Sequence, residues 1–161
     1  MNFKESDHIQ MLRDTLRKFI KNEMPKHLVS KWDQEDYFPK DVFKKLVDLG
    51  VTSLTVPEEY GGSGVDMVAA IATIEELSSR SIGMASAFIQ CSCYAGLNIL
   101  ESGSMEQKNE LLPRVANGEL LFSYGISEPD VGGDVASVLT IAKLDNDEVI
   151  INGSKRWCSG V

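Results

Sequence analysis

The chain has 161 residues, and its content of 43% hydrophobic and 25% charged residues is that of a folded globular protein rather than a disordered, collagenous or coiled-coil chain. Asp and Glu outnumber Lys and Arg by 24 to 16, so that the net charge is −8. Because binding to a phosphate backbone needs a basic surface, this composition argues against a nucleic-acid partner.

Residues 1–50 show the apolar spacing of two amphipathic helices. Ser6 can cap the first, whose apolar residues recur three and four apart at Ile9, Leu12, Leu16, Phe19 and Ile20. Pro25 ends or kinks this helix, because proline lacks the donor that a helix interior requires. The second helix begins at Pro39 and ends at Gly50, a left-handed cap, with four residues predicted to be buried: Val42, Phe43, Leu46 and Leu49.

Residues 51–120 continue the helical pattern after one interruption. Residues 51–56 are β-prone, and residues 58–64 form a loop whose glycines lack the spacing of a dinucleotide fingerprint. A third helix is predicted over about 66–79, with an apolar face of Met67, Ile71, Ile74 and Leu77. Residues 81–100 carry no charge, but seven of them are Ser, Gly, Gln or Asn, which favours a buried bundle helix over a membrane span. A capping box at Ser104 opens a fifth helix, which ends at residues 117–118.

After Gly118 the pattern changes to that of strands. Strands are predicted over 121–127, 135–144, 148–151 and 154–158, with a tight turn at 145–147 and a hairpin signal at Asn152-Gly153. The glycine-rich turn over 130–134 has backbone N–H groups that can form an anion-binding nest. The sequence therefore predicts an α+β chain, with an all-α domain over 1–120 and an incomplete antiparallel β domain over 121–161.

The three cysteines indicate a reducing, cytoplasmic location. Cys91, Cys93 and Cys158 cannot all pair, and no spacing among them resembles a disulfide framework. Cys91-x-Cys93 has no nearby histidine or further cysteine, so we predict a structural role for this pair and no metal site. The N-terminal residues lack the apolar region of a signal peptide. The two lone histidines, His8 and His27, are predicted to have surface or capping roles.

Three segments resemble the acyl-CoA dehydrogenase family of flavoproteins. They are VPEEYGG over 56–62, YGISEPDVGGD over 124–134 and INGSKRWCS over 151–159, and their order and spacing agree with the family along the entire chain. The family has a helical domain, a β-barrel-like domain and a C-terminal four-helix bundle, so the resemblance implies that this sequence covers the first domain and enters the second.

The resemblance also implies an activity. Family members use FAD to oxidise an acyl-CoA to the trans-2-enoyl-CoA, pass the electrons to an electron-transferring flavoprotein, and form homodimers or homotetramers. The catalytic glutamate that removes the substrate's α-proton is expected beyond residue 161. No catalytic residue is therefore assigned here, and the chain is expected to be inactive alone.

Seven residues match family positions at the cofactor or the substrate. The resemblance places Ile126 and Ser127 along the flavin, Gly132 and Gly133 near the FAD pyrophosphate, Trp157 on the isoalloxazine and Ser159 near flavin N5. Tyr124 matches an aromatic residue near both flavin and thioester, and Gly133 also matches a position near the CoA. This chain departs from the family's turn, which has small residues and then serine, because Asp130 and Val131 precede the glycines and Gly133 lacks a hydroxyl.

Other functions remain open from the sequence. An acyl-CoA oxidase or a flavin monooxygenase shares the same fold, and differs by letting the flavin react with oxygen. A non-catalytic helical interaction module is a third alternative. Trp157 and Ser127 argue against the interaction module, because such a protein has no need of a flavin-facing indole or hydroxyl.

Overall fold

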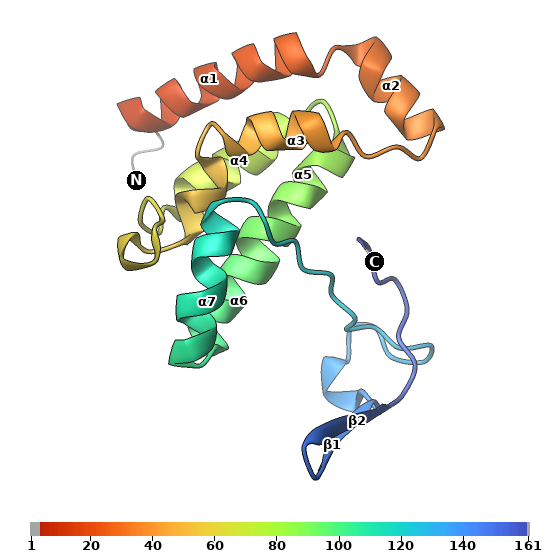
Figure 1. Ribbon diagram of the computed structural model, residues 1–161. Helices are drawn as coiled ribbons and strands as arrows, with labels where there is room; N and C mark the ends of the chain where they lie inside the picture. Colours follow the sequence, from red (N-terminus) through yellow and green to blue (C-terminus); the bar gives the residue numbers. More distant parts are fainter. Residues whose placement is uncertain (1–3, 161) are drawn as a thin grey trace. The chain divides into compact units, whose positions relative to one another are not determined.

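The computed structural model describes residues 4–160 and consists of two units that divide after Phe122. The first unit is helical (Figure 1). Its helices are α1 (Asp7–Glu23), α2 (Lys26–Gln34), α3 (Lys40–Val47), α4 (Met67–Ser78), α5 (Ile82–Phe88), the π-helical η3 (Ile89–Leu97), α6 (Asn98–Ser102) and α7 (Met105–Ala116), with short 3-10 helices η1 (Val51–Thr55) and η2 (Glu58–Tyr60). The second unit contains the 3-10 turn η4 (Val135–Ser137) and the strands β1 (Ile141–Asp145) and β2 (Glu148–Asn152). The α+β fold class is confirmed.

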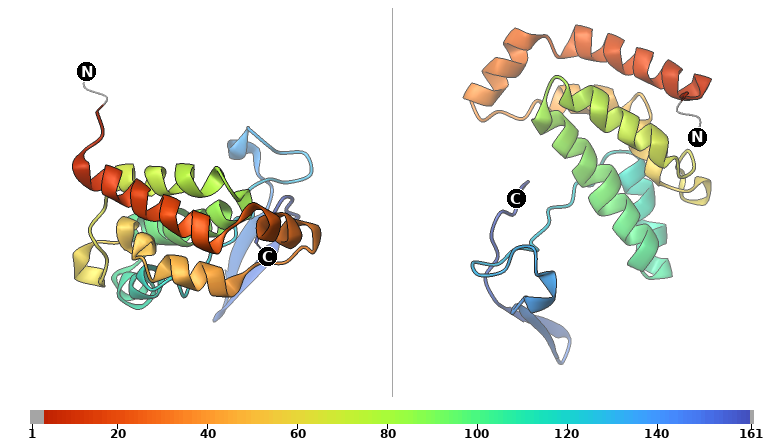
Figure 2. Two further views of the ribbon diagram at one scale, coloured as in Figure 1. Left: turned by 90° about the horizontal axis from the view of Figure 1, so that it is seen from above. Right: turned by 180° about the vertical axis from the view of Figure 1, so that it is seen from behind.

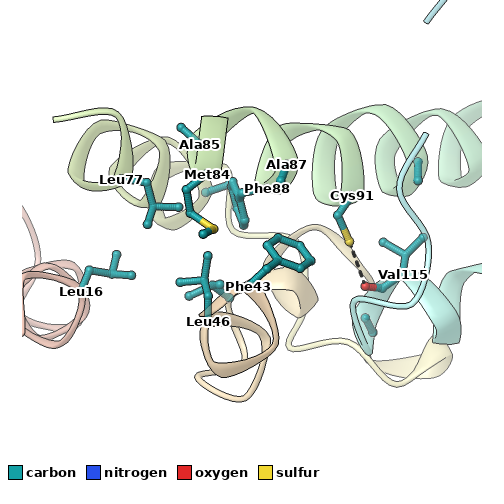
Figure 3. Close-up of a cluster of buried hydrophobic side chains, with 14 of the residues drawn as sticks. Leu16, Phe43, Leu46, Leu77, Met84, Ala85, Ala87, Phe88, Cys91 and Val115 are labelled. Atoms are coloured by element: carbon teal, nitrogen blue, oxygen red, sulfur yellow. Dashed lines mark hydrogen bonds between the residues drawn. The ribbon is translucent and has the colours of Figure 1, made fainter. Parts of the chain in front are cut away.

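The core of the first unit is formed where α1, α3, α4 and α5 meet. Figure 3 shows Leu16 from α1, Leu46 from α3 and Leu77 from α4 directed toward one another, and Phe88 from α5 close to them. All four side chains are completely buried. Burying side chains of this size contributes roughly 1.5–3 kcal/mol each, so this cluster is a main source of the unit's stability.

An ion network joins α1 to α4, which lie side by side (Figure 2). The Arg13 guanidinium lies 2.8 Å from a Glu5 oxygen, 2.5 Å from Glu75 and 3.0 Å from Glu76. Arg17 also pairs with Glu76, at 2.8 Å. The hydrogen bonds that Arg13 donates to Glu5, and then to Glu75 and Glu76, raise the pKa of Arg13. Because Glu76 is buried, these arginines neutralise a charge that would otherwise be costly, and they set the register of the two helices.

The uncharged segment forms one continuous helix from Ile82 to Ser102, with a π-helical middle. The Ser81 hydroxyl caps it by accepting the Met84 N–H at 3.2 Å. The helix is long and apolar enough to cross a membrane, and 56% of its most apolar window is buried inside the unit. It packs beside α7, whose predicted capping box is present, with Ser104 and Gln107 bonding each other's backbone N–H.

Several expectations about the helical unit are corrected by the structure. The helix α2 was not predicted, and residues 51–55 form a 3-10 helix instead of a strand. Among residues 4–160 no strand pairs with residues 51–55. The hydroxyls of Thr52 and Thr55 instead donate to the carbonyls of Ala116 and Ser92, each at 2.8 Å.

The buried face of α4 matches its prediction only in part, since Leu77 is buried and Ile74 packs against the core but the other two predicted residues do not. Met67 and Ile71 are 40% and 50% exposed, and the side that packs is rich in alanine: Ala69, Ala70 and Ala72. Small side chains let α4 approach α1 and α5 closely. The free energy gained from this close packing exceeds what burying the larger apolar residues of the other face would give. Leu49, expected inside, is 42% exposed because α3 has already ended at Val47.

The second unit has one hairpin where four strands were predicted. β1 and β2 pair antiparallel from Ile141↔Asn152 to Asp145↔Glu148, and the predicted turn at residues 145–147 is confirmed by Asn146 at φ 55°. Residues 135–137 form a 3-10 turn, so β1 is shorter than predicted. The segments 121–127 and 154–158 are not strands, because a strand pair needs a continuous series of backbone hydrogen bonds. Within residues 4–160 a single backbone hydrogen bond joins the two segments, from the Arg156 N–H to the Ser127 carbonyl.

Candidate functional site

Two extended segments of the second unit run antiparallel and bring most of the predicted site residues together. The Ser123 hydroxyl donates to the Ser159 carbonyl at 2.7 Å, and the Arg156 N–H donates to the Ser127 carbonyl at 2.8 Å. The Lys155 ammonium donates to the Ile126 carbonyl at 3.0 Å. Tyr124, Ile126 and Ser127 on one segment therefore lie opposite Trp157 and Ser159 on the other.

Trp157 is held in an unusual conformation with its indole in the open. Its φ is 62°, in the left-handed region that a bulky residue rarely adopts, and its side chain is 76% exposed. The Arg156 guanidinium lies 4.8 Å from the ring centroid, a cation–π distance. One face of the indole thus has a cationic neighbour, and the other face is free to stack on a flat ligand. A strained, exposed aromatic residue of this kind is typical of a binding site.

The sequence motif over 124–134 also contains hydrogen-bond donors without a protein acceptor in residues 4–160. The N–H groups of Ile126, Ser127, Gly132 and Gly133, and the Ser127 hydroxyl, donate to no acceptor within residues 4–160. Neither glycine has a positive φ, so these N–H groups are presented by a turn with ordinary backbone angles. A planar ligand that carries many acceptor atoms and a phosphate suits this donor set.

The turn before the glycines is compact and adds negative charge. Glu128 and Val131 form an isolated β-bridge, with N···O distances of 2.9 and 3.2 Å, and Val131 is one of two buried residues in the described part of this unit. Asp130 and Asp134 are exposed on either side of the glycines. Two carboxylates beside the free N–H groups lower the affinity of this turn for phosphate.

Glu128 is a site residue that sequence reasoning did not identify. Its carboxylate accepts hydrogen bonds from the Leu139 N–H at 2.8 Å, the Thr140 N–H at 2.9 Å and the Lys155 ammonium at 2.9 Å. The Thr140 hydroxyl, followed by the Leu139 N–H and Lys155, lowers the pKa of Glu128 to about 2. The sequence around position 128 gives little indication that this carboxylate is buried, because its hydrogen-bond partners lie 11 to 27 residues away in the chain.

The cysteines and His8 have structural surroundings. The Cys91 thiol is buried and donates to the Val115 carbonyl at 3.4 Å, and burial raises its pKa to about 12 (Figure 3). His8 lies 3.1 Å from Asp66, whose other oxygen caps α4 at the Ala69 N–H. Within the part of the chain that the structure describes, no three His, Cys, Asp or Glu residues are arranged to hold a metal ion.

Comparison with known proteins relates this chain to the acyl-CoA dehydrogenases. Residues 6–119 match the acyl-CoA dehydrogenase N-terminal domain. The chain is 34% identical to the probable acyl-CoA dehydrogenase YngJ of Bacillus subtilis, over 98% of this chain and 41% of that protein. It is 40% identical to the mitochondrial isobutyryl-CoA dehydrogenase of Dictyostelium discoideum, over 86% of this chain and 33% of that protein.

A solved structure supports the same relationship. The acyl-CoA dehydrogenase complexed with FAD from Bacillus anthracis superposes with a TM-score of 0.82 at 31% identity, over 96% of this chain and 27% of that one. The chain thus spans well under half the length of the proteins that it resembles.

Proposed function

The chain belongs to the acyl-CoA dehydrogenase family, and from this premise we propose that it supplies the helical domain and the flavin-facing segments of an FAD-dependent enzyme that oxidises an acyl-CoA to the trans-2-enoyl-CoA. One observation carries the proposal. The proposal is supported by the antiparallel segments 123–127 and 155–159, which pair the backbone next to the exposed Trp157 with backbone next to N–H and hydroxyl donors that have no protein acceptor in residues 4–160.

The residues present fit FAD. The N–H groups of Ile126 and Ser127 and the Ser127 hydroxyl match the acceptor atoms on the pyrimidine side of a flavin, and the open face of Trp157 matches its ring system. The N–H groups of Gly132 and Gly133 match the pyrophosphate. When bound, FAD supplies the two-electron acceptor for the oxidation. Donors held in place at its pyrimidine side stabilise the negative charge that develops there.

We propose that the acyl-CoA thioester lies near Tyr124 and that its CoA portion passes Gly133. The base that removes the α-proton would come from the part of the family fold that this chain does not span. Electron-transferring flavoprotein is the proposed electron acceptor, and a homodimer or homotetramer is the proposed assembly. A reducing, cytoplasmic location is proposed from the sequence, because three cysteines cannot all pair and no spacing among them resembles a disulfide framework.

The function is tested on a protein that contains the whole family fold. This chain is followed either by its own reading frame beyond Val161 or by the corresponding part of YngJ, which is 34% identical to it. The purified protein is expected to be yellow, and butyryl-CoA or isobutyryl-CoA added without oxygen is expected to bleach the flavin absorbance. A folded, monodisperse protein that takes up no FAD refutes the proposal.

Two controls sharpen this test. Peroxide release at the rate of substrate consumption would assign the chain to an oxidase of the same fold instead. The 161-residue chain alone is expected to be helical but to hold little FAD, because every residue of β1 and β2 is exposed. Tight binding of one FAD by that chain would show that the first strands suffice for the cofactor.

A further inference from the structure

The centre of the second unit is a carboxylate rather than an apolar cluster. Glu128 is 7% exposed and Val131 9%, whereas all ten residues of β1 and β2 are exposed. Among the described residues from 123 on, Glu128 is the only polar side chain that is buried. Since an ionised carboxylate is costly to remove from water, its position calls for a structural reason.

The contacts of Glu128 give that reason, because they join three segments that are distant in the chain. One oxygen accepts the Leu139 N–H at 2.8 Å, and the other accepts the Thr140 N–H at 2.9 Å and the Lys155 ammonium at 2.9 Å. Lys155 at the same time donates to the Ile126 carbonyl at 3.0 Å. The ammonium thus ties the segment that carries Trp157 to the segment that carries Ile126, Ser127 and Glu128.

Gly153 makes this arrangement possible from the other side. A Cβ atom added there would lie 2.2 Å from the Thr140 hydroxyl oxygen and 2.6 Å from its Cβ. The backbone therefore approaches Thr140 so closely that only glycine fits, and this approach brings residues 154–157 back past Glu128. The Asn152-Gly153 pair, predicted as a hairpin turn, serves as this point of close contact.

We propose that Glu128 and Lys155 are positioning residues of the flavin site. They hold the backbone of Ile126 and Ser127 beside Arg156 and Trp157, so that the free donors and the open indole face the same ligand. The inference deepens the proposed function and rests on it. A buried ion pair suits this task better than an apolar contact, because its hydrogen bonds define one register between the segments.

The test uses Lys155→Met, which keeps the aliphatic stem but removes both ammonium contacts, and Glu128→Gln, which keeps the shape but removes the charge. Lys155→Arg restores the charge. Lys143→Met, at an exposed position of β1, is the control for loss of a positive charge. All variants are made in the protein with the whole family fold. They also carry Trp32→Phe, which leaves Trp157 as the one tryptophan among residues 1–161.

Two measurements are made, and one of them needs no cofactor. In the FAD-free protein, Lys155→Met and Glu128→Gln are expected to lower the fluorescence anisotropy of Trp157, with Lys155→Arg close to the parent. FAD dissociation constants are expected to rise tenfold or more in the first two variants, while the far-ultraviolet melting of the helices is unchanged. The double variant is expected to have the same anisotropy and the same FAD dissociation constant as the single variants, because both substitutions remove the same ion pair.

The proposal is overturned if Lys155→Met resembles Lys143→Met in both measurements, or if anisotropy and FAD affinity fall only in proportion to the melting temperature. Failure of the proposed function gives a different result. In that case the parent protein itself binds no FAD, while the anisotropy of Trp157 in the variants still decides whether the pair positions this segment. Where tryptophans from an appended part interfere, they are replaced by phenylalanine in parent and variants alike.

Discussion

Replacing Trp157 by alanine separates binding from stability, because the indole is exposed in the protein and is proposed to be covered by the flavin. A tryptophan side chain has on the order of 250 Å² of surface, and 76% of it is exposed here. Arg156 lies against one face, so a flavin on the other face would cover about half of the exposed area, roughly 95 Å². At about 25 cal/mol per Å², this contact is worth ~2.4 kcal/mol. The FAD dissociation constant is then expected to rise about 50-fold.

The assay for this variant is a titration of FAD into the apoprotein with the whole family fold, read from flavin fluorescence. The midpoint of urea unfolding is expected to change little, because substitution of an exposed side chain costs within about 0.5 kcal/mol. Leu144→Ala is the matched control, since Leu144 is 82% exposed on the same unit but lies on the hairpin. If Trp157→Ala binds FAD within twofold of the parent, the indole does not contact the flavin and the reasoning from its exposure is refuted.

Three further outcomes are expected. Phe88→Ala, at a completely buried position, should destabilise the helical unit by about 3–5 kcal/mol in urea unfolding followed at 222 nm; Ile82→Ala, 76% exposed on the same helix, should cost little, and equal effects would contradict the core in Figure 3. Because hydrogen bonds lower the pKa of Glu128 from 4.5 to about 2, its contribution to stability is complete above about pH 4.5 and is lost as the pH falls toward 2. The Thr140 amide resonance should report this acid transition, and its persistence in Glu128→Gln would assign it to another group. Because burial raises the pKa of Cys91 to about 12, this thiol should react with Ellman's reagent at pH 8 only after unfolding, and rapid reaction in the native protein would show that it is accessible.

The helical unit was largely predictable because its signals are local. The capping box at Ser104, the left-handed Gly50 and the apolar spacing of α1 each depend on residues within one or two turns, so they can be read without knowledge of the fold. Spacing alone predicted only part of the packing face of α4, namely Ile74 and Leu77. The rest of that face was decided by contact with α1 and α5, where alanines allow the helices to come close and leave Met67 and Ile71 outside.

The β unit shows the opposite balance. The turn at Asn146 and the strands on either side of it were predicted, because a hairpin closes over a few residues. The segments 121–127 and 154–158 have the composition of strands but lack continuous partners, since pairing between distant segments depends on the rest of the sheet.

The motifs indicated the family and the residues proposed to face the flavin, and they did so from sequence order alone. Only the tertiary structure showed that Glu128 is buried and that Lys155 joins it to the Ile126 carbonyl. Nothing in the residues around position 128 specifies a partner 27 positions later. Such a charge can be buried only where the folded backbone brings its donors together, so its role is decided by the fold and not by the local sequence.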